Sequence, residues 1–310
     1  MNLAAFCFGE AYIKEGDEVI VTEAEHHSNI VPWQMMCRRK GAILKVLPID
    51  DSGHLIIDEL DSLITDRTRI MAVTHISNVL GIVNPVKDIV EKCHSKGVAV
   101  LVDGAQGAVH CKVDVRDMDC DFYVFSGHKL YAATGTGVLY GKKKWLENMP
   151  PYMGGGEMVG TVKFSGTTYA PLPMKYEAGT QNFASAATLK PAIELLNILN
   201  DNNLEEYNNS IKDYLLNILI NDERIRLYGV PRGTSEEKIP LFSFTVKGIH
   251  HEDLALILDK MGIAVRSGQM CAEPLMDRFG VTGMLRISLA PYNTMQEAEY
   301  LVKCLNKAID

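Results

Sequence analysis

Residues whose side chains can do chemistry recur directly after four short apolar runs of the sequence. Seven of them follow the runs EVIVT, RIMAVT, VAVLV and DFYVF, in chain order: His26, Asn78, Asp103, Gln106, Ser126, His128 and Lys129. In open α/β sheets, ligands bind outside the carboxyl ends of the strands. If the four runs are neighbouring strands, these side chains are expected to meet at one edge of the sheet.

Lys129 and Asp103 together fit pyridoxal phosphate. A lysine amine can form a Schiff base with this cofactor, and a carboxylate can pair with its protonated pyridine nitrogen. Taken alone, Lys129 would be an ordinary loop lysine and Asp103 could simply cap a turn. His26 could stack on the pyridine ring, and Gln106 could donate a hydrogen bond to the phenolic oxygen.

Ser126 and His128 could donate hydrogen bonds to the cofactor phosphate. Each of these assignments is weak when it stands alone. The set becomes specific because all of its members follow strands that are expected to be neighbours.

Apolar strands that alternate with helical patterns must position these residues. Strands are predicted at 18–22, 42–47, 69–74, 98–102, 121–125 and 138–140. Helices are predicted at 31–40, 58–64 and 86–96. This alternation predicts an α/β fold with a mostly parallel sheet that is covered by helices on both faces.

Residues 148–182 differ, because they are rich in proline and glycine and show little periodicity. A stretch of this length without regular structure is usually functional or interface-forming. After it, helices are predicted at 185–200, 204–220, 252–261 and 295–308, with strands at 242–246, 263–266 and 285–290. We expect a large cofactor-binding domain over 1–184 and a smaller α+β domain over 185–310.

Composition narrows the class of protein. The chain of 310 residues has a formal net charge of -8, which argues against nucleic acid as the main partner. The sequence has no run of apolar residues long enough to cross a membrane. Its seven cysteines are scattered, odd in number and free of C-x-x-C spacing, which favours a reducing cytoplasm over a disulfide scaffold or a zinc site. Six of them are predicted to be buried, and Cys271 is treated separately.

Seven segments of the chain resemble cysteine desulfurases of the SUF or selenocysteine-lyase type, which are fold-type-I pyridoxal-phosphate enzymes of the class V aminotransferase family. The segments are EAEHHSNIVPWQ, THISNVLGIVNP, VLVDGAQGAVH, DCDFYVFSGHKLY, YEAGTQN, GIAVRSGQMCAEPLM and RISLAPYNT. The resemblance implies that Lys129 forms the Schiff base, Asp103 pairs with the pyridinium, His26 stacks on the ring and Gln106 binds the phenolic oxygen. It also implies that Asn78 lies beside substrate and cofactor.

The same resemblance assigns residues to the substrate. Arg286 would hold the substrate carboxylate, with Arg266 near the same pocket, and Thr180 would reach the phosphate of the other subunit's cofactor in a homodimer. Cys271 takes the position of the sulfur-accepting cysteine. As a lone cysteine it would more often be structural, although its loop, RSGQMCAEP, is not an obvious core position.

The implied reaction converts L-cysteine to L-alanine. Lys129 would act as the base, the Cys271 thiolate would attack the substrate sulfur, and a sulfur-acceptor protein would take the resulting persulfide for iron–sulfur cluster assembly. Lys129, Cys271 and His26 would be the catalytic residues.

The sequence departs from the family in two places. Met270 stands directly before Cys271, where relatives often carry histidine. The family also has an N-terminal portion ahead of the point where this chain begins. That portion includes a Gly-Thr-rich turn at a helix N-terminus that binds the cofactor phosphate. The first five residues of this chain resemble the interior of that helix.

Three alternatives stay open at this point. The chain could be a selenocysteine lyase, or it could catalyse another class V reaction such as transamination or a kynureninase-like cleavage. The loop around Cys271 argues against the latter, since those reactions need no thiol. The third alternative is an inactive, truncated remnant that binds a partner without turning over substrate.

Overall fold

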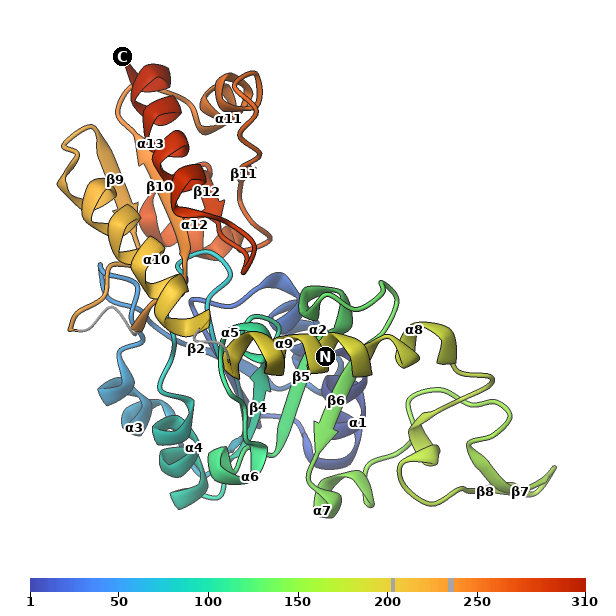
Figure 1. Cartoon of the computed structure of the whole chain (residues 1–310). Coiled ribbons are helices and arrows are strands. Elements are labelled where there is room, and N and C mark those ends of the chain that lie inside the picture. Colours follow the sequence, from blue (N-terminus) through green and yellow to red (C-terminus); the bar gives the residue numbers. More distant parts are fainter. Residues whose placement is uncertain (202–203, 234–236) are drawn as a thin grey trace.

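The first half of the chain builds a six-stranded sheet with the strand order β2-β1-β3-β4-β5-β6 (Figure 1). The computed structural model describes residues 1–201, 204–233 and 237–310. The strands of this sheet are β1 (Glu18–Thr22), β2 (Ile43–Leu47), β3 (Thr68–Thr74), β4 (Ala99–Asp103), β5 (Phe122–Ser126) and β6 (Gly137–Gly141). All neighbours are parallel except β5 and β6. The predicted fold class, an α/β fold with a mostly parallel sheet, is therefore confirmed.

Helices cover both faces of this sheet because successive strand residues point to opposite sides. On one face Val19, Val21 and Leu101 join a core with residues of α1 (Asn2–Tyr12) and α2 (Val31–Lys40). Helix α2 has the predicted bounds, and the Gly41 that follows it adopts the left-handed conformation with φ 67°.

On the opposite face, Ile20, Met71 and Val100 form a second core with residues of α4 (Val86–Ser95) and of α12 (Glu273–Phe279). The short helices α3 (Leu60–Leu63), α5 (Gly107–His110) and α6 (Val115–Met118) connect strands of the sheet, and α7 (Lys143–Leu146) follows its last strand, β6. The 3-10 turns between them are η1 (His27–Asn29), η2 (Ile57–Glu59) and η3 (Gly127–Leu130).

The C-terminal part of the chain forms a four-stranded antiparallel sheet with the order β11-β12-β10-β9. These strands are β9 (Ile225–Tyr228), β10 (Leu241–Val246), β11 (Arg266–Gly268) and β12 (Met284–Ser288). The helices beside them are α10 (Leu204–Asn221), α11 (His251–Asp259) and α13 (Met295–Ile309). Phe242 and Phe244 are fully buried at the centre of this core. Within the ranges that the structure describes, no helix is both long and apolar enough to span a membrane.

Several predicted elements need correction. The strand predicted at 263–266 is wrong, because Ile263 and Val265 pack on the core while ladder pairing begins only at Arg266, opposite Arg286. The helix predicted at 185–200 is interrupted at Thr188 and forms α8 (Phe183–Ala187) and α9 (Leu189–Asp201). Strand β9 was not predicted at all. Cys111, which was expected to be buried, is only half-buried.

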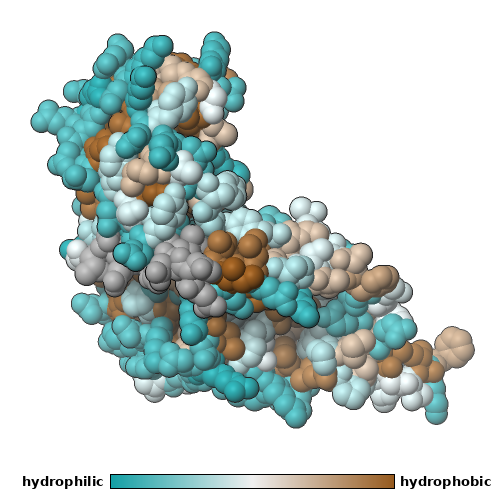
Figure 2. Space-filling view, viewed as in Figure 1, coloured by the Kyte–Doolittle hydropathy of each residue, from teal (hydrophilic) through white to brown (hydrophobic). Residues whose placement is uncertain are grey.

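Residues 148–182, called the arm here, contain more regular structure than predicted. They form the hairpin β7 (Val159–Lys163) and β8 (Gly166–Tyr169) and the turn η4 (Met174–Tyr176). The hairpin projects away from the six-stranded sheet (Figure 1). Apolar side chains are exposed along it (Figure 2). The Val162 side chain is 64% exposed, and that of Phe164 is fully accessible.

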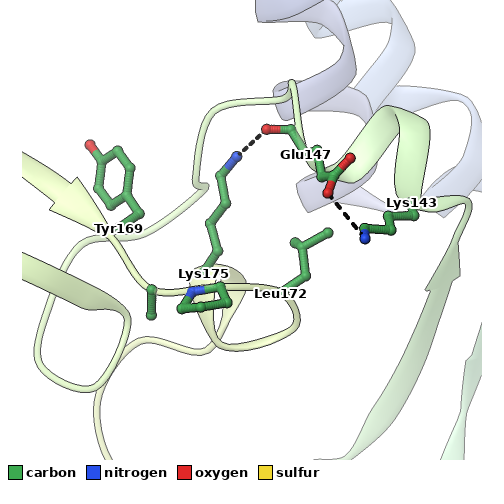
Figure 3. A pocket seen from close by; sticks show the side chains of 7 residues that line it. Lys143, Glu147, Tyr169, Leu172 and Lys175 are labelled. Atoms are coloured by element: carbon green, nitrogen blue, oxygen red, sulfur yellow. Dashed lines mark hydrogen bonds and ion pairs between the residues drawn. The ribbon is translucent and has the colours of Figure 1, made fainter.

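A shallow pocket lies where the arm returns to α7 (Figure 3). The Lys175 ammonium donates to the carbonyl oxygens of Leu146, at 3.3 Å, and of Glu147, at 2.9 Å. Lys143 pairs with the Glu147 carboxylate at 3.4 Å. The two contacts of Lys175 therefore anchor the arm to the end of α7.

Candidate active site

The carboxyl ends of the parallel strands enclose a cavity of about 400 Å³. All seven residues predicted from strand ends line it: His26, Asn78, Asp103, Gln106, Ser126, His128 and Lys129. The structure therefore brings this set together as the strand pattern predicted. Their individual roles stay predictions.

Lys129 lies in η3, directly after β5, and Asp103 is the last residue of β4. Burial lowers the pKa of the Lys129 ammonium, Asp103 acts in the opposite direction, and Arg286 lowers the pKa further. A lowered pKa leaves more of the amine neutral and nucleophilic. Asp103 is buried, and its Oδ1 accepts a hydrogen bond from the Ala105 backbone N–H at 3.0 Å.

The His26 ring is held at the cavity wall by its own loop. Its Nδ1 accepts a hydrogen bond from the Ser28 backbone N–H at 3.0 Å and lies 2.9 Å from Ser28 Oγ. Burial lowers the pKa of His26, and Lys129 lowers it further. The imidazole is therefore neutral and carries its proton on Nε2, which suits stacking against a planar ring.

Glu25 is a fully buried carboxyl next to His26, and the sequence pattern suggested no role for it. Its Oε1 accepts hydrogen bonds from Thr22 Oγ1 at 2.6 Å and from the Thr74 backbone N–H at 2.7 Å. Its Oε2 accepts from Asn29 Nδ2 at 2.6 Å. Burial raises the pKa of Glu25 to about 8. The carboxyl thus ties the end of β1 to the end of β3 and to η1.

His75 also follows a strand, yet it does not line the cavity. It is buried, and its Nδ1 lies 3.0 Å from the Tyr123 hydroxyl. Burial lowers the pKa of His75 to about 4, so the ring stays neutral. Its place in the structure is that of a hydrogen-bonded core residue.

Asn78 joins three parts of the site. Its side-chain Nδ2 donates to the Met270 carbonyl oxygen at 2.8 Å, and its own carbonyl oxygen accepts from Arg286 Nη1 at 2.8 Å. Asn78 follows β3, Arg286 lies in β12, and Met270 precedes Cys271. Strand-end reasoning found Asn78 but not these links, because they join segments far apart in the sequence.

Arg286 carries a donor that the protein leaves unused. Its Nε is buried and has no hydrogen-bond partner among the described residues. Arg266, which is exposed, lies directly opposite Arg286 in the β11–β12 ladder. Burial lowers the pKa of Arg286, and Arg266 lowers it further. A bound carboxylate would both pair the free donor and offset the repulsion between the two guanidinium groups.

Cys271 is the only exposed member of the seven cysteines, all of which lie in described ranges. It sits in the loop between β11 and α12, and it interacts electrostatically with Lys129 and Arg286. Met270 and Cys271 both adopt positive φ angles, 55° and 57°. The thiol is thus presented to solvent on a strained turn beside the cavity.

Thr180 does not line the cavity of its own chain. It lies at the end of the arm, where it is exposed. The role predicted for it, at a phosphate of another subunit, requires a second copy of the chain.

A family model described as aminotransferase class-V matches residues 1–301. A cysteine desulfurase from Cronobacter sakazakii is 47% identical over 303 residues, which cover 97% of this chain and 73% of that protein. A probable cysteine desulfurase from Vibrio cholerae is 44% identical over 310 residues, covering all of this chain and 76% of that protein.

Solved structures agree with these relatives. The crystal structure of a cysteine desulfurase from Escherichia coli superposes with a TM-score of 0.92 at 42% identity, covering 99% of this chain and 76% of that one. The apo structure of a cysteine desulfurase from Thermococcus onnurineus gives a TM-score of 0.91 at 32% identity, with the same coverage. The chain therefore spans about three quarters of the length of these proteins.

Proposed function

Because this chain belongs to the class V aminotransferase family, we propose that it is a pyridoxal-phosphate-dependent cysteine desulfurase that leaves the substrate sulfur on Cys271. One observation carries the proposal. The cavity that holds Lys129 and Asp103 is joined through Asn78 both to the loop of an exposed thiol and to an arginine with a free, buried donor.

The residues of the cavity fit pyridoxal phosphate. The buried carboxylate of Asp103 suits a protonated pyridine nitrogen, the neutral His26 ring suits its face, and Gln106 suits the phenolic oxygen. Ser126 and His128 would bind the phosphate. When bound, the cofactor supplies an electron sink for charge that develops at the substrate α-carbon.

The protein's own groups then divide the work. Lys129, with its lowered pKa, would hold the cofactor covalently and, as a free amine once substrate is bound, would accept the α-proton on Nζ. Arg286, with Arg266 beside it, holds the substrate carboxylate. The Cys271 thiolate would attack the substrate sulfur, so an S–S bond forms as the C–S bond breaks. The electron pair of the broken bond stays with the β-carbon, which takes up a proton, and alanine leaves. The persulfide sulfur would pass to an acceptor protein for iron–sulfur cluster assembly.

We expect the enzyme to work as a homodimer. Exposed apolar side chains on and next to the arm, including Val162, Phe164 and Phe183, offer a surface for a second copy. Thr180 lies in the same region, so that copy could bring Thr180 to the phosphate of its partner's cofactor. The scattered cysteines, odd in number and without C-x-x-C spacing, favour the cytoplasm as its compartment, and the net charge of -8 disfavours nucleic acid as a partner.

An absorption spectrum of the purified chain, titrated with pyridoxal phosphate, tests the cofactor. We expect saturable binding with a visible or near-ultraviolet band that Lys129→Ala abolishes. The absence of saturable binding would favour the inactive remnant.

Product analysis tests the reaction. With L-cysteine and a reductant, we expect alanine and sulfide, and Cys271→Ala should lose both while it keeps the absorption band. A Cys271→Ala variant that still releases sulfide at the wild-type rate would refute the persulfide step. Activity on L-selenocysteine alone would identify a selenocysteine lyase, and a keto acid formed from an amino donor would indicate transamination.

A further inference from the structure

His27 contacts the loop of Cys271 through both its backbone and its side chain. Its backbone N–H donates to the Cys271 carbonyl oxygen at 2.8 Å. Its ring Nε2 accepts a hydrogen bond from the Glu273 backbone N–H at 2.9 Å. His27, a residue of the η1 turn, therefore forms hydrogen bonds with the loop on both sides of Ala272.

The loop needs such contacts to keep its shape. Non-glycine residues rarely adopt positive φ, and a backbone of this kind persists only where its surroundings determine it. Here two such residues, Met270 and Cys271, are consecutive. At the start of α12, Ala272 provides no side-chain acceptor for the first N–H groups of the helix. The imidazole of His27, from a distant part of the chain, provides the missing acceptor for the Glu273 N–H.

His26, the residue before His27, lies at a different surface. His26 lines the cofactor cavity, whereas His27 reaches the nucleophile loop. Since the two histidines are adjacent in the chain, the hydrogen bonds of His27 fix the position of the Cys271 loop relative to the cavity wall. To accept a hydrogen bond at Nε2, the His27 ring must be unprotonated at that atom.

We propose that His27 is a positioning residue that holds the Cys271 thiol in place for attack on the substrate sulfur. This inference rests on the proposed desulfurase function. It assigns the two adjacent histidines separate tasks, with His26 at the cofactor and His27 at the nucleophile. A small displacement of a reacting group can slow a reaction by orders of magnitude, so the contact is expected to act on rate rather than on binding.

The test compares His27→Ala with His27→Gln in the cofactor-loaded enzyme. Loss of the imidazole should slow single-turnover persulfide formation on Cys271 about tenfold or more, while the L-cysteine concentration that half-saturates the spectral change stays within about twofold. Gln should restore most of the rate, because its side-chain oxygen can accept from the Glu273 N–H. His250→Ala is the matched control, since His250 accepts from the Glu252 N–H at 3.4 Å at the start of α11.

Two readouts do not depend on turnover. In His27→Ala, the amides of residues 270–275 should exchange hydrogen faster, and the rate at which iodoacetamide alkylates Cys271 should change, with the melting temperature recorded alongside. Persulfide formation within twofold of wild type in His27→Ala, or equal loss in the Ala and Gln variants, would overturn the proposal. A wild-type protein without desulfurase activity would instead defeat the proposed function, and the exchange and alkylation rates would still report whether His27 holds the loop.

Discussion

Glu25 illustrates how a single buried carboxyl can link stability of this protein to pH. It accepts three hydrogen bonds at the end of β1, and burial raises its pKa to about 8. The unfolded chain loses this proton near the ordinary glutamate value, whereas the folded chain keeps it up to about pH 8. Between those values the unfolded state binds fewer protons, so the free energy of unfolding falls as pH rises.

We therefore expect Glu25→Gln to flatten the pH dependence of stability. From about pH 5 to about pH 8, the wild type should lose up to about 1.4 kcal/mol per pH unit relative to the variant. Denaturant unfolding at several pH values measures the slope, and a constant offset between the proteins does not affect it. Glu15→Gln, at an exposed position, is the control. Parallel curves for wild type and Glu25→Gln would show that Glu25 does not titrate in this window.

Residues of the site differ in how well the sequence predicts them. The side chains that line the cavity follow apolar strands, and this signal is local, so the sequence alone placed Lys129 and Asp103 together. Glu25 and His27 lie in the same segment as His26 but were not singled out. Their importance depends on contacts with Thr74 and Glu273, and the sequence does not show such contacts between distant segments.

At the scale of elements, the turn after β4 is fixed by close packing under the cavity. Gly104 and Gly107 flank Ala105 and Gln106, and a Cβ atom on Gly104 would overlap the Tyr123 ring. A Cβ on Gly107 would overlap His75. Because the Tyr123 hydroxyl is hydrogen-bonded to His75, the Tyr123 ring cannot easily move aside.

Gly104→Ala should lower the free energy of unfolding by about 1–3 kcal/mol, as overpacking of a filled core does. It should also weaken cofactor binding, because Asp103 and Gln106 lie on either side of the strained turn. Gly156→Ala is the matched control, since a Cβ there meets nothing within 4 Å. Denaturant unfolding and cofactor titration measure the two effects, and equal stability of both variants would contradict the packing argument.

Elements with a strong periodic pattern were predicted closely, and weakly patterned ones were not. Strand β4 and helix α2 have continuous or periodic apolar residues, and the structure places them within a residue of the prediction. Strand β9 reads IRLY, is short and lies at a sheet edge, so its pairing with β10 decides its structure. The residues of the β7–β8 hairpin are almost all exposed, so its strands show no alternation of apolar and polar residues from which they could be predicted.

At the scale of the whole molecule, the proposed second copy would meet the arm and α8. We expect a dimer by light scattering for the wild type. Phe183→Glu should weaken it about tenfold or more, because Phe183 is 72% exposed next to the arm and a buried charge there would be unpaired. Leu256→Glu, which changes a 62% exposed residue of α11, should leave the dimer intact. A wild-type monomer, or equal behaviour of both variants, would contradict this interface.

The division at residue 184 into two domains stays a prediction, and the packing of α12 bears on it. Leu275, Met276 and Phe279 belong to α12, late in the chain, yet they pack in the same core as Ile20 and Val100 of the six-stranded sheet. Arg278 in the same helix donates to the Ile49 carbonyl oxygen at 3.2 Å and to Asp51 at 2.9 Å. The helix that follows Cys271 is thus part of a core of the six-stranded sheet, although it lies in the second half of the sequence.

The packing of α12 also sets an order of events during translation. A ribosome makes all six strands of the sheet long before it makes α12, so one face of the nascent sheet stays partly uncovered until α12 emerges. The helix that finally closes this face brings Cys271 with it. Completion of the core and arrival of the proposed nucleophile beside the cavity therefore coincide, and a partly made chain exposes its uncovered sheet face before it holds Cys271.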